Sequence, residues 1–153
     1  MSEMPETHEA LVAEVRIAIY AAIEASGSAP AAADIAADRH LEPAKVESAL
    51  RALDAAHVIV LQPGTTEIKW APPFSAVHTA FRVRAGRTAW FAPCAWDAFG
   101  IPAAIDLDAR IDAACAWSKD PIPCGVEFGR AYGDGVIHLL VPAAHFWDDI
   151  AYT

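Results

Sequence analysis

The sequence has few cysteines and few basic side chains. Its 153 residues include 3 cysteines, and 11 lysines and arginines stand against 20 aspartates and glutamates, for a formal charge of -9. Three cysteines without a Cys-x-x-Cys pair exclude a disulfide framework and give no structural zinc motif. The negative field repels phosphate backbones, so we expect no nucleic-acid partner.

Long apolar runs are also missing. No stretch reaches the roughly 18 uninterrupted apolar residues of a membrane-spanning helix. The first residues, Met1 to Glu9, are acidic and polar and lack the basic and apolar regions of a secretory signal. Hydrophobic residues still make up 55% of the chain, which is ample for a core. We therefore expect a cytoplasmic protein with no membrane segment.

The first half of the chain predicts three helices followed by a hairpin, the order of a winged helix. The predicted elements are helices at about 9–25, 31–37 and 43–55 and strands at 57–61 and 67–70. Lys45 and Arg51 on the third helix favour DNA recognition, whereas Glu42, Glu47 and Asp54 on the same helix oppose it. The alternative is a helical cap that packs on the following domain, and this is the interpretation we favour.

The second half predicts short strands and turns. Ala71-Pro72-Pro73 stiffens the chain, so we place a boundary there, with a winged-helix-like domain at 1–72 and a second domain at 73–153. Strands are expected at 81–84, 88–92, 108–114, 125–128 and 136–141, and a short helix leading into a strand at 145–153. The predicted fold class is α+β, with a mixed or antiparallel β core and short helices.

The segment 91–102 carries the chemistry that the sequence suggests. Pro93 disfavours helix before it, and Gly100 to Pro102 reads as a stop, so a short helical turn is expected from Cys94 to Phe99. A cysteine at a helix start gains from unpaired N–H groups and from the helix dipole, which favour a thiolate. Asp97 is three residues on and lies on the same helix face. Cys94 and Asp97 are therefore candidate catalytic residues.

A plainer alternative stays open for this pair. Cys94 can be a small buried apolar residue, and Asp97 a first-turn carboxylate that the helix dipole stabilises. Other candidates have similar alternatives. Cys115 is expected to be a buried core cysteine, His138 a structural strand residue, and His145 a weak candidate near the end. Trp90 and Trp96 flank Cys94, and we expect core packing from them more than substrate contact.

The run from Arg87 to Ala104, with Cys-Ala-Trp-Asp at its centre and a Pro-Ala pair after it, resembles the organomercurial (alkylmercury) lyases. The segment 109–115 is similar to that family's strand ending in a structural cysteine. The segment 136–142 is similar to its next long strand. An N-terminal helical domain ahead of this core also fits the family. The resemblance covers most of the chain and is most specific around Cys94.

The resemblance implies protonolysis of carbon–mercury bonds, giving a hydrocarbon and Hg(II). A thiolate, here Cys94, would take the mercury, and a carboxyl group, here Asp97, would supply the proton. The family uses a second catalytic cysteine, which is expected after residues 147–152. The chain is thus interpreted either as a fragment, incomplete at its C-terminus, or as a member that works without that thiol. Cys124 is the spare thiol, so the predicted mercury ligands are Cys94, Asp97 and Cys124.

The resemblance implies no resident cofactor, with Hg(II) as bound product. It also implies an organomercurial substrate and cellular thiols or a mercury-reducing enzyme as acceptor of the metal. The alternative function is a non-catalytic soft-metal or thiol-binding protein, for Hg(II), Cu(I) or another soft metal. A metal-responsive winged-helix regulator is a variant of this alternative.

Overall fold

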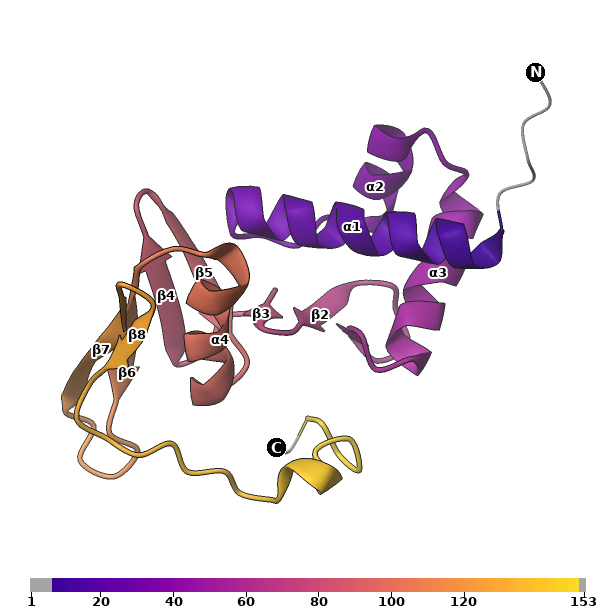
Figure 1. Ribbon diagram of the computed structural model, residues 1–153. Helices are drawn as coiled ribbons and strands as arrows, with labels where there is room; N and C mark the ends of the chain where they lie inside the picture. Colours follow the sequence, from indigo (N-terminus) through magenta and orange to yellow (C-terminus); the bar gives the residue numbers. More distant parts are fainter. Residues whose placement is uncertain (1–6, 152–153) are drawn as a thin grey trace.

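The computed structural model describes residues 7–151 and shows an α+β fold (Figure 1). The helices are α1 (His8–Ser26), α2 (Ala32–Arg39), α3 (Pro43–Ala55), α4 (Ala95–Ile105) and the 3-10 helix η1 (Ala143–His145). The strands are β1 (Val60–Leu61), β2 (Ile68–Ala71), β3 (Phe74–Ser75), β4 (Phe81–Ala85), β5 (Thr88–Ala92), β6 (Ala109–Ala114), β7 (Pro121–Glu127) and β8 (Arg130–Tyr132). The predicted α+β class is confirmed, and the β core, predicted to be mixed or antiparallel, is antiparallel.

The three N-terminal helices begin and end where the sequence signals predict. Thr7 caps α1 by accepting a hydrogen bond from the Ala10 N–H at 3.2 Å, and Pro43 occupies the first turn of α3. Gly27 ends α1 in the left-handed region, with φ of 76°. A Cβ on Gly27 would lie 2.2 Å from the Ala89 carbonyl oxygen, so only glycine fits this contact between α1 and β5. The apolar stripes of these helices form the N-terminal part of the core.

The eight strands of residues 7–151 join one antiparallel sheet in the order β1-β2-β3-β5-β4-β6-β7-β8. The predicted hairpin ahead of residue 72 is β1-β2, and it continues into the rest of the sheet because Ala71 on β2 pairs with Phe74 on β3. In Figure 1, α1 to α3 gather at one side of the molecule, α4 and β4 to β8 at the other, and β2 and β3 lie between them.

One face of the sheet is the core face. Four buried residues are paired from strand to strand across this face: Trp90 on β5, Val83 on β4, Ile111 on β6 and Cys124 on β7. Directly paired residues of antiparallel strands point to the same side of a sheet, so these four share a face. Helix α4 packs against the same strands through its own buried residues. The Trp90 indole N–H donates to the Ile23 carbonyl at 2.8 Å, which ties α1 to the sheet.

Helix α4 is longer than the sequence predicts. Gly100 and Pro102 do not stop it at Phe99, and the helix ends only at Asp106, whose φ is 53°. Proline in a helix loses one hydrogen bond, but Pro102 is fully buried, as is Ile101 beside it, and this packing offsets the loss. Gly100 lets Pro73 approach, since a Cβ there would lie 3.3 Å from the Pro73 Cβ. Gly100 and Pro102 act through contacts with distant parts of the chain, which the local sequence does not reveal.

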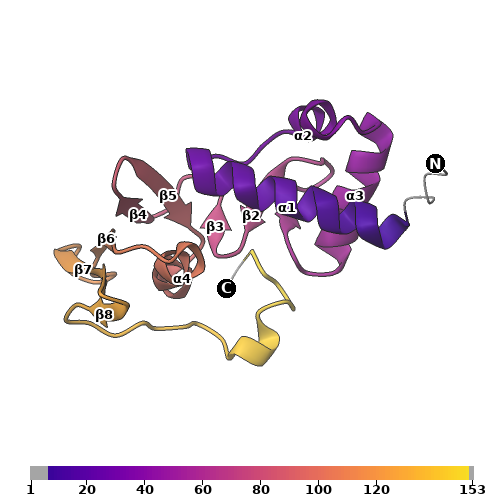
Figure 2. The ribbon, with the colours of Figure 1, turned by 45° about the horizontal axis from the view of Figure 1, so that its top comes forward.

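The segment 136–141 is not the strand that its composition predicts. It has no strand partner within residues 7–151, and several of its apolar side chains are exposed, with Val136 at 95% and Leu140 at 63%. A strand exists only where a neighbour takes its backbone hydrogen bonds, and β-propensity cannot supply that neighbour. The segment runs past α4 (Figures 1 and 2) to a stack of Trp147 on His57, with ring centroids 4.1 Å apart.

The predicted helix leading into a strand at 145–153 is only partly described. Residues 143–145 form η1, turns follow, and Tyr152 and Thr153 lie outside the described residues. Within residues 7–151, no helix is both long and apolar enough to span a membrane.

Candidate active site

Cys94 lies at the junction of β5 and α4. Strand β5 is fixed on both sides by β3 and β4, and the Thr79 hydroxyl donates to the Ala92 carbonyl at 2.6 Å, just before the junction. Cys94 then takes an extended conformation and occupies the N-cap position of α4. The prediction that Cys94 stands at a helix start is therefore confirmed. A reactive group at this place is supported by the sheet beneath it and by the helix that follows.

The structure brings Cys94 and Asp97 together. The Cys94 thiol donates a hydrogen bond to the Asp97 carboxylate, with 3.2 Å between Sγ and Oδ2. Both residues are half-buried. The contact follows from the helical geometry, which sets residues three apart on one face. A sulfur and a carboxyl group in direct contact can exchange a proton without any rearrangement of the chain.

The electrostatics of Cys94 differ from the sequence expectation. Burial raises the pKa of the Cys94 thiol, and the negative charge of Asp97 raises it further. The backbone N–H groups of Asp97 and Trp96 oppose these effects, but they do not outweigh them, and the sulfur makes no capping hydrogen bond. The expected thiolate at the helix start is thus wrong for the free protein. Partial burial beside a carboxylate overrides the helix terminus.

Asp97 is also shifted toward its protonated form. Burial raises the pKa of the Asp97 carboxyl group, and the hydrogen bond from Cys94 only partly offsets the shift. An aspartate with a raised pKa holds a proton more readily near neutral pH than an exposed one. The pair therefore retains protons at the site, which suits a group that delivers a proton.

Cys124 is placed elsewhere. It is buried in β7 on the core face of the sheet, and its Sγ lies 3.7 Å from the Ile111 carbonyl oxygen. Burial raises the pKa of the Cys124 thiol. Within residues 7–151, no three or more histidine, cysteine or acidic side chains gather in a group able to hold a metal ion. The structure therefore does not assemble the predicted ligand set of Cys94, Asp97 and Cys124.

Comparison with known proteins identifies the family. A family model described as MerB, alkylmercury lyase, matches residues 74–153, which is more than half of the chain and includes Cys94 and Asp97. The chain belongs to the alkylmercury lyase family. No curated protein sequence matches it.

The fold of this family member is similar to a crystal structure of the mercury-bound form of MerB2. The TM-score is 0.62 at 23% sequence identity, and the match covers 82% of this chain. The chain spans 63% of the length of that MerB2 structure. The likeness extends beyond the family match at 74–153, so it includes part of the N-terminal region as well.

Cys115 differs from the expectation of a buried core cysteine. It is half-buried at the end of β6, in the turn to β7, where its backbone N–H donates to the Asp120 carbonyl at 2.9 Å. The pKa of the Cys115 thiol is lowered, chiefly by hydrogen bonding from Ser118, both backbone N–H and side chain, and also by the Trp117 N–H. In this alkylmercury lyase family member, Cys94, Cys115 and Cys124 are all free thiols.

The remaining candidate residues differ in their burial and contacts. Trp90 is buried, as the core-packing interpretation predicts, whereas Trp96 is 66% exposed. His138 lies exposed in the segment that is not a strand, and His145 pairs with Asp148 at 2.8 Å in an exposed contact. Thr79 was not among the predicted site residues. Its hydroxyl binds a carbonyl thirteen residues further along the chain, and the local sequence gives no sign of such a contact.

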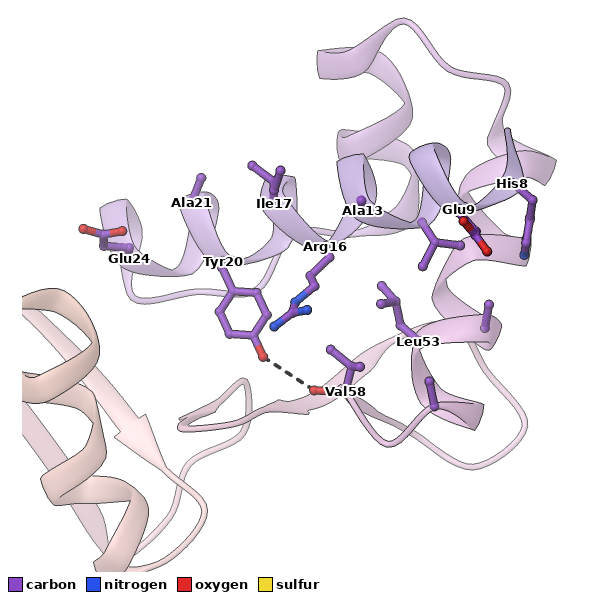
Figure 3. A pocket seen from close by; sticks show the side chains of 13 residues that line it. His8, Glu9, Ala13, Arg16, Ile17, Tyr20, Ala21, Glu24, Leu53 and Val58 are labelled. Carbon is purple, nitrogen blue, oxygen red and sulfur yellow. Dashed lines mark hydrogen bonds between the residues drawn. The ribbon is translucent and has the colours of Figure 1, made fainter. Parts of the chain in front are cut away.

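A groove lies away from this site. It is an open, mostly apolar hollow of about 900 Å³ between α1 and α3 (Figure 3). Arg16 points into it beside Tyr20, whose hydroxyl donates to the Pro72 carbonyl at 3.0 Å. Neither Cys94 nor Asp97 lines this groove.

Proposed function

We propose that the chain cleaves carbon–mercury bonds by protonolysis, with Cys94 as the mercury-binding nucleophile and Asp97 as the proton donor. The observation that carries the proposal is the 3.2 Å hydrogen bond from the Cys94 thiol to the Asp97 carboxylate, inside the region that matches the alkylmercury lyase family. Mercury is a soft metal and prefers a thiolate, and a departing carbanion needs an acid in contact. The pair supplies both groups at one point.

The first step is an exchange of thiols on mercury. A mercurial R–Hg–SR′, carried by a small thiol, approaches Cys94, the bond between Sγ and mercury forms, and R′S⁻ leaves. The Cys94 proton passes along the existing hydrogen bond to the Asp97 carboxylate. Burial raises the pKa of the Asp97 carboxyl group, which favours its keeping this proton for the second step.

In the second step the carbon–mercury bond breaks. Its electron pair stays on carbon, which takes the proton from Asp97, and the hydrocarbon R–H is released. Hg(II) remains on the Cys94 thiolate, and R′S⁻ returns as its second ligand. No group is oxidised or reduced. Cellular thiols or a mercury-reducing enzyme then accept the Hg(II).

Release of hydrocarbon tests the proposal. The protein is mixed with phenylmercury in excess small thiol, and benzene is measured by gas chromatography. We expect release by the native chain, none by Cys94→Ser, and near-native release by the matched control Cys115→Ser, whose thiol lies in a different turn. Thermal unfolding of both variants establishes that they fold. Unchanged release by Cys94→Ser overturns the assignment, and mercury uptake without release favours a soft-metal-binding protein.

We further propose that residues 1–72 form a winged-helix-like unit that acts as a cap on the lyase-like part at 73–153. Two contacts support a cap over a DNA reader. Arg51 on α3 is paired with Glu47 at 3.2 Å, which weakens it as a phosphate ligand, and Asp54 accepts a hydrogen bond from the Leu61 N–H at 3.0 Å. A salt-sensitive shift of duplex DNA by the protein in a gel assay would contradict this proposal.

A further inference from the structure

Cys94 by itself cannot distinguish one organomercurial from another. The bond from its sulfur goes to mercury, which is the same atom whatever organic group it carries. Preference among organic groups must therefore come from side chains that touch the group itself. Three hollows, between α1 and α3, along β6 and β7, and beside the end of β4, do not have Cys94 or Asp97 in their walls, so we seek this side chain on the surface around the thiol.

Trp96 is the large apolar side chain beside the thiol. It occupies the first turn of α4, two residues after Cys94, and its backbone N–H lies close enough to the Cys94 sulfur to affect the thiol pKa. Helical side chains lean toward the helix N-terminus, so the Trp96 side chain leans toward the end of α4 at which Cys94 stands, about 100° around the helix from Asp97.

The indole of Trp96 has a free surface. It is 66% exposed, whereas Trp90 on the other side of Cys94 is 3% exposed and fills the core. Within the described part of the chain, Trp96 makes no ring contact with another aromatic side chain. An exposed indole offers a flat apolar face, which contacts an aromatic ring more favourably than it contacts a methyl group.

We infer that Trp96 is a specificity-determining residue that contacts the organic group of a mercurial bound at Cys94 and favours aryl over methyl groups. This inference rests on the proposed function for the position of the mercury and goes beyond it in naming the preferred substrate class. The contact is present both in the bound substrate and in the transition state. Trp96 should therefore act on KM and leave kcat nearly unchanged.

The test compares phenylmercury with methylmercury on the native chain, Trp96→Ala and Trp96→Phe. Binding is measured first, as the equilibrium exchange of each mercurial between glutathione and the protein, followed by intact-protein mass spectrometry. Cys94→Ser gives the background from Cys115 and Cys124. Phe128→Ala is the matched control, because Phe128 is an equally large aromatic side chain that is 92% exposed and lies in the turn between β7 and β8, outside α4. Hydrocarbon release is measured on the same samples.

We expect Trp96→Ala to weaken phenylmercury binding roughly two- to tenfold, the range for an aromatic contact, and to leave methylmercury binding nearly unchanged. Trp96→Phe should keep most of the preference, and Phe128→Ala all of it. An equal loss for both mercurials, or no loss for either, overturns the inference. If the preference is lost as expected but the native chain releases no hydrocarbon, the proposed function fails and the role of Trp96 stands.

Discussion

Cys94 and Cys115 both follow the end of a β-strand, yet their surroundings move the two thiols in opposite directions. At the β5–α4 junction, burial and the Asp97 carboxylate raise the pKa of Cys94. In the β6–β7 turn, hydrogen bonding from Ser118 and Trp117 lowers the pKa of Cys115. What a thiol is packed against therefore decides its ionisation more than the type of element that it precedes.

The two thiols also differ in whether their neighbours suit mercury binding alone or cleavage of the carbon–mercury bond as well. The Cys115 thiolate forms more readily, but its neighbouring groups are N–H donors and the Lys119 ammonium. Cys94 ionises less readily, but its thiol donates to the Asp97 carboxylate, and we propose that this group takes the proton and returns it to carbon. A thiolate alone holds mercury, whereas breaking the carbon–mercury bond requires an acid as well. The contrast supports our proposal that the chemistry lies at Cys94, although the pKa of the Cys115 thiol is the lowered one.

Removal of the acid gives the largest expected effect. Asp97→Asn keeps the size of the side chain but cannot deliver a carboxylic proton, so hydrocarbon release should fall by about 100-fold or more. Mercury binding at Cys94 should persist, since the sulfur is intact. Hydrocarbon release and mercury stoichiometry are measured on the same protein, with Asp120→Asn in the β6–β7 turn as a matched control. Release within a factor of a few of the native rate would remove Asp97 from the mechanism.

Much of this arrangement is predictable because it is local. Three helices, the signals at Gly27 and Pro43, and the hairpin that leads to Cys94 all follow from residues near one another in the sequence. The contact of Cys94 with Asp97 is also local, because one helical turn joins them. Periodicity, caps and short spacings carry this information directly.

What sequence analysis got wrong depends on distant parts of the chain. Helix α4 continues past Gly100, where Pro73 lies close and where Ile101 and Pro102 are buried, and the segment 136–141 is not a strand because it lacks a neighbouring strand among residues 7–151. The pKa of Cys94 follows burial by other elements, and the pKa of Cys115 follows the conformation of a turn. The propensities of neighbouring residues do not include packing partners, burial or the conformation of a turn.

Alkylation by iodoacetamide should distinguish the two thiols through pH. The thiolate is the reactive form, so a thiol with a lowered pKa reacts at lower pH and one with a raised pKa at higher pH. Cys115 should therefore be modified first as pH rises, and Cys94 later. Peptide mass spectrometry after short exposures at each pH follows both sites. Asp97→Asn should move the Cys94 profile to lower pH by removing the carboxylate charge. Earlier modification of Cys94 than of Cys115 in the native chain would contradict the comparison.

Ser118→Ala should give the smallest effect. The hydroxyl that helps to lower the pKa of Cys115 is lost, but the backbone N–H of residue 118 remains, so the alkylation profile of Cys115 should move to higher pH only in part. The Cys94 profile should not move, because Ser118 lies in the other turn. Ser118 is exposed, and besides its contact with Cys115 its hydroxyl accepts a hydrogen bond from the Asp120 N–H at 3.3 Å, so the free energy of unfolding should change by less than about 0.5 kcal/mol. A shift at Cys94 equal to that at Cys115 would show that the two thiols are coupled.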